Sequence, residues 1–289
     1  MQEPLSSHTH LGMGGPADLF FLPVDLDDLS SCLPAILNAG VPVLPLGGGT
    51  NMLARSGGFR GLVICLSDGA QQIDVQQGRA TAQAGASLQV LSRQCQRIGG
   101  AGLEFGCGIP GTVGGAVRGN AGAWGGETMD RLEWLAGVDL ASGEQVRLAQ
   151  AEVSYRYRWT GLAASLLILE AGFRLDEDDP ADIEARMDEM LAQRKASQPL
   201  WNRNAGCIFK NPANTSAGLL IDQAGCKGLS SGGATISDLH ANFIVNRGDA
   251  TPEDVLSLID LVRERVLRTH GVALETEVRI VGAHGVENA

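Results

Sequence analysis

Apolar residues recur at intervals of three and four residues along four stretches of the chain, a pattern typical of helices with one buried face. The first stretch lies among short apolar runs at Phe20–Leu22, Val41–Leu46 and Leu62–Leu66, which predicts strands around a helix. Pro34 falls inside that helix, where proline removes a backbone donor. The periodic positions are Leu26, Leu29, Leu33, Ile36 and Leu37; Leu88, Leu91, Cys95 and Ile98; Ile183, Met187, Met190 and Leu191; and Val255, Leu258, Ile259, Val262 and Val266.

Polar and glycine residues mark the ends of three of these helices. Gly99-Gly100 stops the second, and Asp179-Pro180 is placed to open the third. The fourth begins at Thr251–Asp254, where a capping threonine precedes a proline and two acidic residues, and it ends at Gly271. Beyond it, Glu275–Val281 alternates in polarity and predicts a strand that carries Glu275, Glu277 and Arg279 on one face.

The order of these elements predicts three domains in the 289 residues, a length typical of two or three. The strand and helix rhythm defines the first, at residues 1–66. Short strands with glycine turns dominate the second, at residues 67–178. The acidic segment Asp176–Pro180 is predicted to be a linker, and the third domain occupies residues 179–289.

Charge and composition exclude several classes of protein. The formal net charge of −11 argues against a general nucleic-acid or anionic-membrane surface, so an anionic ligand needs a local site. No window is apolar enough to span a membrane, and the first 23 residues lack the features of a secretory signal. The six cysteines are scattered without a metal-binding spacing or a dense disulfide pattern, and reduced thiols favour the cytoplasm. We expect no metal site and no membrane insertion.

Glycine, at 39 residues, is about twice as frequent as usual and is concentrated in two places. The segment Leu46–Asn51 follows an apolar strand, and Gly108–Gly115 is followed closely by Asn120–Ala123. Neither matches the phosphate-loop pattern, and each by itself is typical of a tight turn. Two such loops in an acidic chain favour a dinucleotide bound through its pyrophosphate, because small residues can turn backbone N–H groups toward an anion.

Successive motifs along nearly the whole chain resemble those of the UDP-N-acetylenolpyruvoylglucosamine reductase (MurB) family, in its shorter type II subclass. Any one motif is weak evidence, whereas their order is highly specific. The motifs are His8–Pro16, Pro45–Asn51, Gly108–Glu127, Tyr155-Arg156, Asn204–Pro212, His240–Asn246 and Leu274–Gly282.

The resemblance implies an α+β protein, with a two-part FAD-binding fold of the vanillyl-alcohol-oxidase (PCMH) type and a C-terminal α+β substrate-binding domain. It implies reduction of UDP-N-acetylglucosamine enolpyruvate to UDP-N-acetylmuramate, a cytoplasmic step of peptidoglycan synthesis. The cofactor would be non-covalent FAD and the hydride donor NADPH.

The resemblance also assigns three catalytic residues. Arg156 would stabilise the enolate-like charge, Cys207 would donate the proton, and Glu277 would assist as a further acid or orienting group. Guanidinium pairs well with carboxylate, and an ordinary thiol is protonated at neutral pH. Taken without the motif, a cysteine in such a sequence is typical of core packing.

Further residues are expected to bind the cofactor and the substrate. The cofactor-binding set is Gly47, Gly48, Gly49, Thr50, Asn51, Gly108, Ile109, Pro110, Gly111, Thr112, Gly114, Gly115, Asn120, Ala121 and Gly122. The substrate-binding set is Tyr155, Lys195, Asn211 and His240. The chain has only three lysines, Lys195, Lys210 and Lys227, and a lysine is suited to a pyrophosphate.

Two departures from the family pattern leave alternatives open. The usual Tyr-Arg-x-Ser is here Tyr155-Arg156-Tyr157-Arg158, so a shift of two residues would make Arg158 the catalytic arginine. The N-terminal motif commonly has an arginine where Gly12 stands. Two other functions also remain open: another flavin oxidoreductase of the same fold, including one with a cysteinyl flavin at Cys107, and a non-catalytic UDP-sugar or flavin-binding protein.

Overall fold

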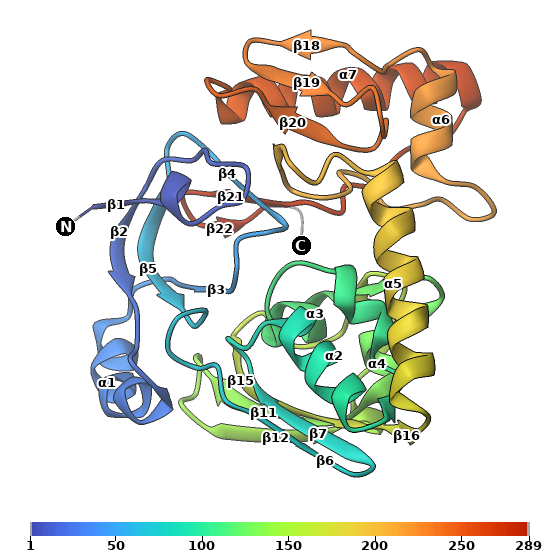
Figure 1. Ribbon diagram of the computed structural model, residues 1–289. Coiled ribbons are helices and arrows are strands. Elements are labelled where there is room, and N and C mark those ends of the chain that lie inside the picture. The colour runs from blue at the N-terminus through green and yellow to red at the C-terminus, as the bar shows by residue number, and fades with distance from the viewer. Residues whose placement is uncertain (1, 288–289) are drawn as a thin grey trace. The chain divides into compact units, whose positions relative to one another are not determined.

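A computed structural model describes residues 2–287 and divides the chain into two units by the contacts among its residues (Figure 1). Unit 1 comprises the residues up to Leu19, Gly49–Leu62, and the chain from Lys195 onward. Unit 2 comprises Phe20–Gly48 and Val63–Arg194. Strands β2 (Pro16–Phe21) and β5 (Phe59–Cys65) carry the chain from one unit to the other.

Unit 2 is built on an antiparallel sheet with the strand order β12-β11-β15-β7-β6. The helices α2 (Leu88–Arg97) and α3 (Val113–Gly119) pack on this sheet (Figure 1). Side chains alternate along the strands, so that Ala80 and Ala82 of β7 are buried beneath the helices. The strands are β6 (Ile73–Gln76), β7 (Arg79–Gln83), β11 (Leu132–Asp139), β12 (Gln145–Ala149) and β15 (Leu166–Arg174).

Short elements complete unit 2 and carry most of the loops expected to be functional. They are β3 (Val43–Leu46), β8 (Gly100–Ala101), the 3-10 helices η2 (Glu104–Gly108) and η3 (Gln150–Glu152), β9 (Gly122–Ala123), β10 (Gly126–Glu127), α4 (Thr128–Arg131), β13 (Tyr155–Arg156), β14 (Trp159–Thr160) and β16 (Asp176–Glu177).

The helix α1 (Leu26–Ala39) confirms the first predicted helix. Asp25 caps its first turn by accepting the N–H of Asp28 at 2.8 Å, and Gly40 ends it in the left-handed region at φ +61°. The helix continues past Pro34, so this proline does not shorten it.

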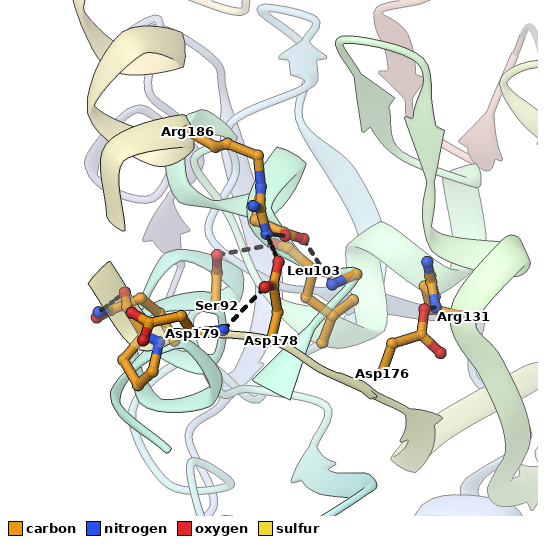
Figure 2. A network of polar contacts seen from close by, with 11 residues as sticks. Ser92, Leu103, Arg131, Asp176, Asp178, Asp179 and Arg186 are labelled. Carbon is orange, nitrogen blue, oxygen red and sulfur yellow. Dashed lines mark hydrogen bonds and ion pairs between the residues drawn. The ribbon is translucent and has the colours of Figure 1, made fainter. Parts of the chain in front are cut away.

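The third predicted helix is α5 (Pro180–Ser197), whose Ile183 and Met187 are buried. Arg186, in the first half of α5, donates to Glu104 at 2.8 Å and to Asp178 at 2.7 Å. The bond from Arg186 lowers the pKa of the Asp178 carboxyl. Figure 2 shows Arg186 directed at Asp178 and Arg131 directed at Asp176.

The predicted linker Asp176–Pro180 is therefore not a free connection, because Asp176 and Glu177 pair as β16 with β8 of unit 2. The three-domain division at residues 66/67 and 178/179 stays a prediction.

Unit 1 contains a sheet with the order β17-β20-β19-β18, against which α7 (Pro252–His270) packs (Figure 1). Its apolar core combines residues of α7, the short helix α6 (Ala217–Gln223) and this sheet, such as Leu258 and Ile236, with residues of connecting segments, such as Phe209. The strands are β17 (Arg203–Asn204), β18 (Ser230–Ser231), β19 (Ala234–Ile236) and β20 (Ile244–Asn246).

The ends of α7 confirm the predicted capping signals. Thr251 accepts the N–H of Asp254 at 3.2 Å, while the Asp254 carboxylate accepts the N–H of Thr251 at 2.9 Å. Gly271 ends the helix at φ +68°.

A second sheet of unit 1 has the order β22-β21-β4, in which β4 (Met52–Ala54) and β21 (Arg279–Gly282) are parallel. The strand predicted over Glu275–Val281 is too long, because only its part from Arg279 pairs with β4. Upstream, Thr276 makes a single bridge with Phe209. The remaining elements are β1 (Glu3–Pro4), the 3-10 helix η1 (Leu5–Ser7) and β22 (Gly285–Val286), and β1-β2-β5-β3 form a further sheet.

Within residues 2–287, every helix is either too short or too polar to traverse a lipid bilayer.

Candidate active site

The two glycine-rich loops meet in unit 2. A Cβ atom placed on Gly47 would lie 2.3 Å from Oγ1 of Thr112, so only glycine allows the first loop to approach the second this closely. Thr112 is buried and caps α3 by accepting the N–H of Gly115 at 3.4 Å. The two predicted loops therefore lie next to one another, while their joint binding of a cofactor stays a prediction.

The backbone donors of the two loops differ in how they are used. The N–H groups of Val113 and Gly114 donate to Ala86 O and Ala84 O, both at 2.8 Å, so the start of α3 is bonded to the chain itself. Those of Gly48 and Gly49 donate to no group in the described part of the chain. Free amides on a small-residue loop fit the pyrophosphate of a dinucleotide such as FAD.

Asn120 ends α3 in the left-handed region at φ +44° and is fully buried. Its side chain donates to Oε2 of Glu127 at 2.8 Å and to the carbonyl of Arg156 at 3.2 Å, and its Oδ1 accepts the N–H of Met129 at 3.0 Å. Because Asn120 fixes the segment that continues into Ala121 and Gly122, its first role in the structure is to shape the predicted cofactor loop.

Arg156 and Arg158 lie in very different surroundings, although they are two residues apart. The guanidinium of Arg156 is exposed and lies over the ring of Trp159, 4.3 Å from its centroid. The guanidinium of Arg158 is mostly buried and donates to Gly122 O at 2.6 Å. An arginine that binds a substrate carboxylate needs an accessible guanidinium, which favours Arg156 in that role.

Cys207 and Glu277 lie on neighbouring segments of unit 1. The N–H of Glu277 donates to Ile208 O at 2.7 Å, and that of Lys210 donates to Glu275 O at 2.9 Å. Asn51 Nδ2 donates to Glu277 O at 3.1 Å, which brings the end of the first glycine loop to the same place. The structure thus brings together the backbone segments that carry Cys207, Glu277 and Asn51, from three distant parts of the sequence.

Asn242 fixes this arrangement, and it is not among the residues that were predicted from the sequence. Its Oδ1 accepts the N–H of Phe209 at 2.9 Å, and its Nδ2 donates to Phe209 O at 2.8 Å, while both residues are almost fully buried. The N–H of Ile208 also donates to Asn242 O at 2.9 Å. Asn242 lies within the motif His240–Asn246, but only the structure pairs it with the cysteine segment.

The predicted substrate residues are spread over both units. Tyr155 is exposed on β13 of unit 2. In unit 1, Asn211 accepts the N–H of Ala217 at 3.0 Å, and Lys195 is exposed near the end of α5. His240 accepts the N–H of Asn242 at its Nδ1, and burial lowers the pKa of its imidazole.

The space beside Gly12 is taken by another arginine. A Cβ atom on Gly12 would lie 2.9 Å from Nη1 of Arg203, and the backbone of Gly12 has φ +67°. Both residues line a cavity of about 580 Å³ in unit 1, together with Trp201. Where the family commonly has an arginine at position 12, this chain has glycine, and the guanidinium of Arg203, four residues before Cys207, lies beside it.

Cys107 is unsuited to a covalent flavin. Its thiol is buried among Ala101, Ile183 and Met187, and burial raises its pKa, so a reactive thiolate is disfavoured. Within residues 2–287 no cluster of three or more His, Cys, Asp or Glu side chains could hold a metal ion.

Comparisons with known proteins give a consistent result. Residues 198–281 match the family model of the UDP-N-acetylenolpyruvoylglucosamine reductase C-terminal domain, and residues 17–149 match that of an FAD binding domain. The UDP-N-acetylenolpyruvoylglucosamine reductase of Geobacter metallireducens is 45% identical over 97% of this chain and 93% of its own length. That of Heliobacterium modesticaldum is 44% identical over 98% of this chain and 91% of its own.

Among solved structures, the UDP-N-acetylenolpyruvylglucosamine reductase of Thermus caldophilus is similar, with a TM-score of 0.84 and 34% identity. The alignment covers 97% of this chain and 98% of that one.

Proposed function

The chain belongs to the UDP-N-acetylenolpyruvoylglucosamine reductase family, and we propose that it reduces the enolpyruvyl group of UDP-N-acetylglucosamine enolpyruvate to give UDP-N-acetylmuramate, with FAD as cofactor and NADPH as hydride donor. The expected α+β fold, an FAD-binding part of the vanillyl-alcohol-oxidase type with a C-terminal substrate-binding part, is confirmed by the family models and the solved relative. The reaction belongs to peptidoglycan synthesis.

The observation that carries this proposal is the convergence of Cys207, Glu277 and Asn51 in unit 1. The backbone bond from Glu277 to Ile208 and the side-chain bond from Asn51 to the backbone of Glu277 bring together the segments of the residues proposed as proton donor, assisting carboxylate and cofactor contact. Adjoining segments that carry these three residues fit a reaction in which a proton must reach the substrate beside the cofactor, which supports the proposal.

The flavin, when bound, supplies a hydride to the distal carbon of the enolpyruvyl double bond. Negative charge then develops on the neighbouring carbon and its carboxylate, and a proton must reach that carbon. The residues of this chain have to bind the pyrophosphate, stabilise the charge and deliver the proton.

Gly47, Gly48, Gly49, Thr50 and Asn51 are proposed to hold the cofactor with the second loop. The free N–H groups of Gly48 and Gly49 support this role, because they can donate to phosphate oxygens without breaking a bond in the protein. The second-loop residues are Gly108, Ile109, Pro110, Gly111, Thr112, Gly114, Gly115, Asn120, Ala121 and Gly122.

Arg156 is proposed to bind the substrate carboxylate and stabilise the developing charge. Its side chain is exposed and makes no ion pair among the described residues, and the ring of Trp159 supports one face of it. A guanidinium positioned in this way needs little reorganisation when charge develops.

Cys207 is proposed to donate the proton to the carbon, with Glu277 as an assisting acid or orienting group. The thiol is partly accessible on a short segment that Asn242 fixes through Phe209. Tyr155, Lys195, Asn211 and His240 are proposed to bind the substrate.

We propose that the protein acts in the cytoplasm. None of the six cysteines, all within the described residues, forms a disulfide, which is compatible with a reducing compartment.

The purified protein tests the function directly. We expect the two-band absorption of oxidised flavin, and NADPH oxidation that depends on UDP-N-acetylglucosamine enolpyruvate. A colourless protein that FAD cannot reconstitute would overturn the proposal. A yellow protein that oxidises NADPH only with another acceptor would indicate a different flavin oxidoreductase, and one without turnover would indicate a binding protein.

A further inference from the structure

Three residues of unit 2 adopt left-handed backbone conformations close together in the fold. Asn120 has φ +44°, Trp124 has φ +50° and Arg158 has φ +53°. The left-handed region is unfavourable for residues other than glycine, and asparagine tolerates it better than arginine. Among the described non-glycine residues, only Asn214 has a positive φ elsewhere. Strain of this kind persists where surrounding contacts enforce it.

Two short hairpins account for two of these residues. The first, residues 122–127, pairs β9 with β10 and turns at Trp124 and Gly125. The second, residues 155–160, pairs Arg156 with Trp159, which leaves Tyr157 and Arg158 as its two turn residues. The second hairpin carries Arg156 on its first strand.

Arg158 connects the second hairpin to the first. Its Nη2 donates to Gly122 O at 2.6 Å, and its Nη1 lies 4.0 Å from Oε1 of Glu127. Both side chains are largely buried, at 19% and 26% exposure. A planar guanidinium can serve a carbonyl and a carboxylate at once, which a single ammonium does less well.

Glu127 and Asn120 complete the connection. The other carboxylate oxygen of Glu127 accepts from Asn120 Nδ2 at 2.8 Å, and the same amide group donates to Arg156 O at 3.2 Å. The backbone of Arg156 is therefore tied to the end of α3 through Asn120, while the turn beyond it is tied to β9 through Arg158.

We infer that Arg158 is a positioning residue that fixes the hairpin of Arg156 against the Asn120–Glu127 segment and so sets where the guanidinium of Arg156 lies relative to the cofactor loop. This inference rests on the proposed catalytic role of Arg156. Arg158 itself does not touch the substrate. Its left-handed conformation is maintained because its guanidinium is held by Gly122 and Glu127.

The substitution Arg158→Asn tests this, because asparagine suits the left-handed turn while its shorter side chain carries no guanidinium to bind Gly122 and Glu127. We expect flavin reoxidation by the enolpyruvyl substrate to slow about tenfold, the scale of one hydrogen bond to a charged group, while flavin reduction by NADPH changes less than about twofold. Amide hydrogen exchange in residues 155–160 should accelerate about tenfold.

The control is Arg174→Asn, which removes another arginine of unit 2 that donates to a backbone carbonyl, that of Asp130 at 2.6 Å. It should leave both half-reactions and the exchange of residues 155–160 unchanged. Arg158→Lys should restore part of the lost reoxidation rate.

A double-mutant cycle separates positioning from direct catalysis. If Arg158 acts through Arg156, adding Arg158→Asn to Arg156→Ala should slow reoxidation no further. Effects that multiply would show that Arg158 contacts the substrate itself and would overturn the inference, as would unchanged hydrogen exchange in Arg158→Asn.

If Arg156→Ala alone reoxidises at the wild-type rate, the catalytic role of Arg156 under the proposed function fails and this inference falls with it. If only the Arg158 variants behave like wild type, the inference fails and the proposed function stands.

Discussion

Asn242→Ala should destabilise unit 1 and slow one half-reaction selectively. The change removes both hydrogen bonds to Phe209, at 2.9 and 2.8 Å, and leaves a buried N–H and a buried C=O without their partners. Each such group costs about 1–3 kcal/mol, so the expected loss of unfolding free energy is about 2–6 kcal/mol. The urea midpoint should fall by about 1–3 M, for a typical dependence of about 2 kcal/mol per M of urea.

The catalytic consequence follows from the position of Phe209. It lies two residues after Cys207, and it forms a β-bridge with Thr276, the residue before Glu277. Small displacements of reacting groups cost up to about 10²-fold in rate, so we expect reoxidation by the enolpyruvyl substrate to slow on this scale. Flavin reduction by NADPH should be little changed. Stopped-flow absorbance of the flavin measures the two half-reactions separately.

Asn246→Ala is the matched control. Asn246 is also buried in unit 1, donates to Leu11 O at 2.8 Å and accepts the N–H of Gly248 at 2.8 Å. It should lower the urea midpoint comparably and leave both half-reactions intact. The reasoning is refuted if Asn242→Ala keeps the wild-type midpoint, or if it slows both half-reactions equally.

Three further outcomes are expected. Cys207→Ala should lose about 10²–10⁴-fold in reoxidation, while Cys207→Ser keeps a hydroxyl donor and part of the rate; a wild-type rate for the alanine variant would assign the proton to Glu277 or water. Gly47→Val should release flavin, measured by absorbance after gel filtration, because its Cβ would collide with Thr112, whereas Gly57→Val, which has open space around it, should retain flavin. Below pH ~6.5 the free energy of unfolding should fall, because burial lowers the pKa of His240 and the imidazole takes up a proton on unfolding. Urea titrations at pH 5–7 measure this dependence on pH. It should be weaker in His240→Gln, and an unchanged dependence would contradict the prediction.

Local signals made the helices predictable. For α7, the threonine cap, the proline at its first position and the terminal glycine are all encoded within a few residues of the ends that they set. The strand at Glu275–Val281 was predicted too long because alternation requires only an extended chain with one buried side. Pairing requires a partner, and β4 lies more than two hundred residues earlier in the sequence.

In the candidate site, too, the sequence predicted only those residues that belong to a local motif. Cys207 and Glu277 could be named from motifs, and the structure brings their segments together, while their roles stay proposals. Asn242 could not be identified, since a single polar residue between Ala241 and Phe243 gives no signal of the backbone groups that it binds 33 positions away. The choice between Arg156 and Arg158 also depended on three-dimensional surroundings, because both have the same side chain.

The close approach of Arg203 to Gly12 has an evolutionary consequence. Since a Cβ at position 12 would lie 2.9 Å from Nη1 of Arg203, a side chain at position 12 requires the guanidinium of Arg203 to move. The two positions are thus epistatic, and the order in which they mutate matters. An arginine introduced at position 12 would therefore be tolerated better in a chain whose residue 203 is smaller, because its Cβ would then have room.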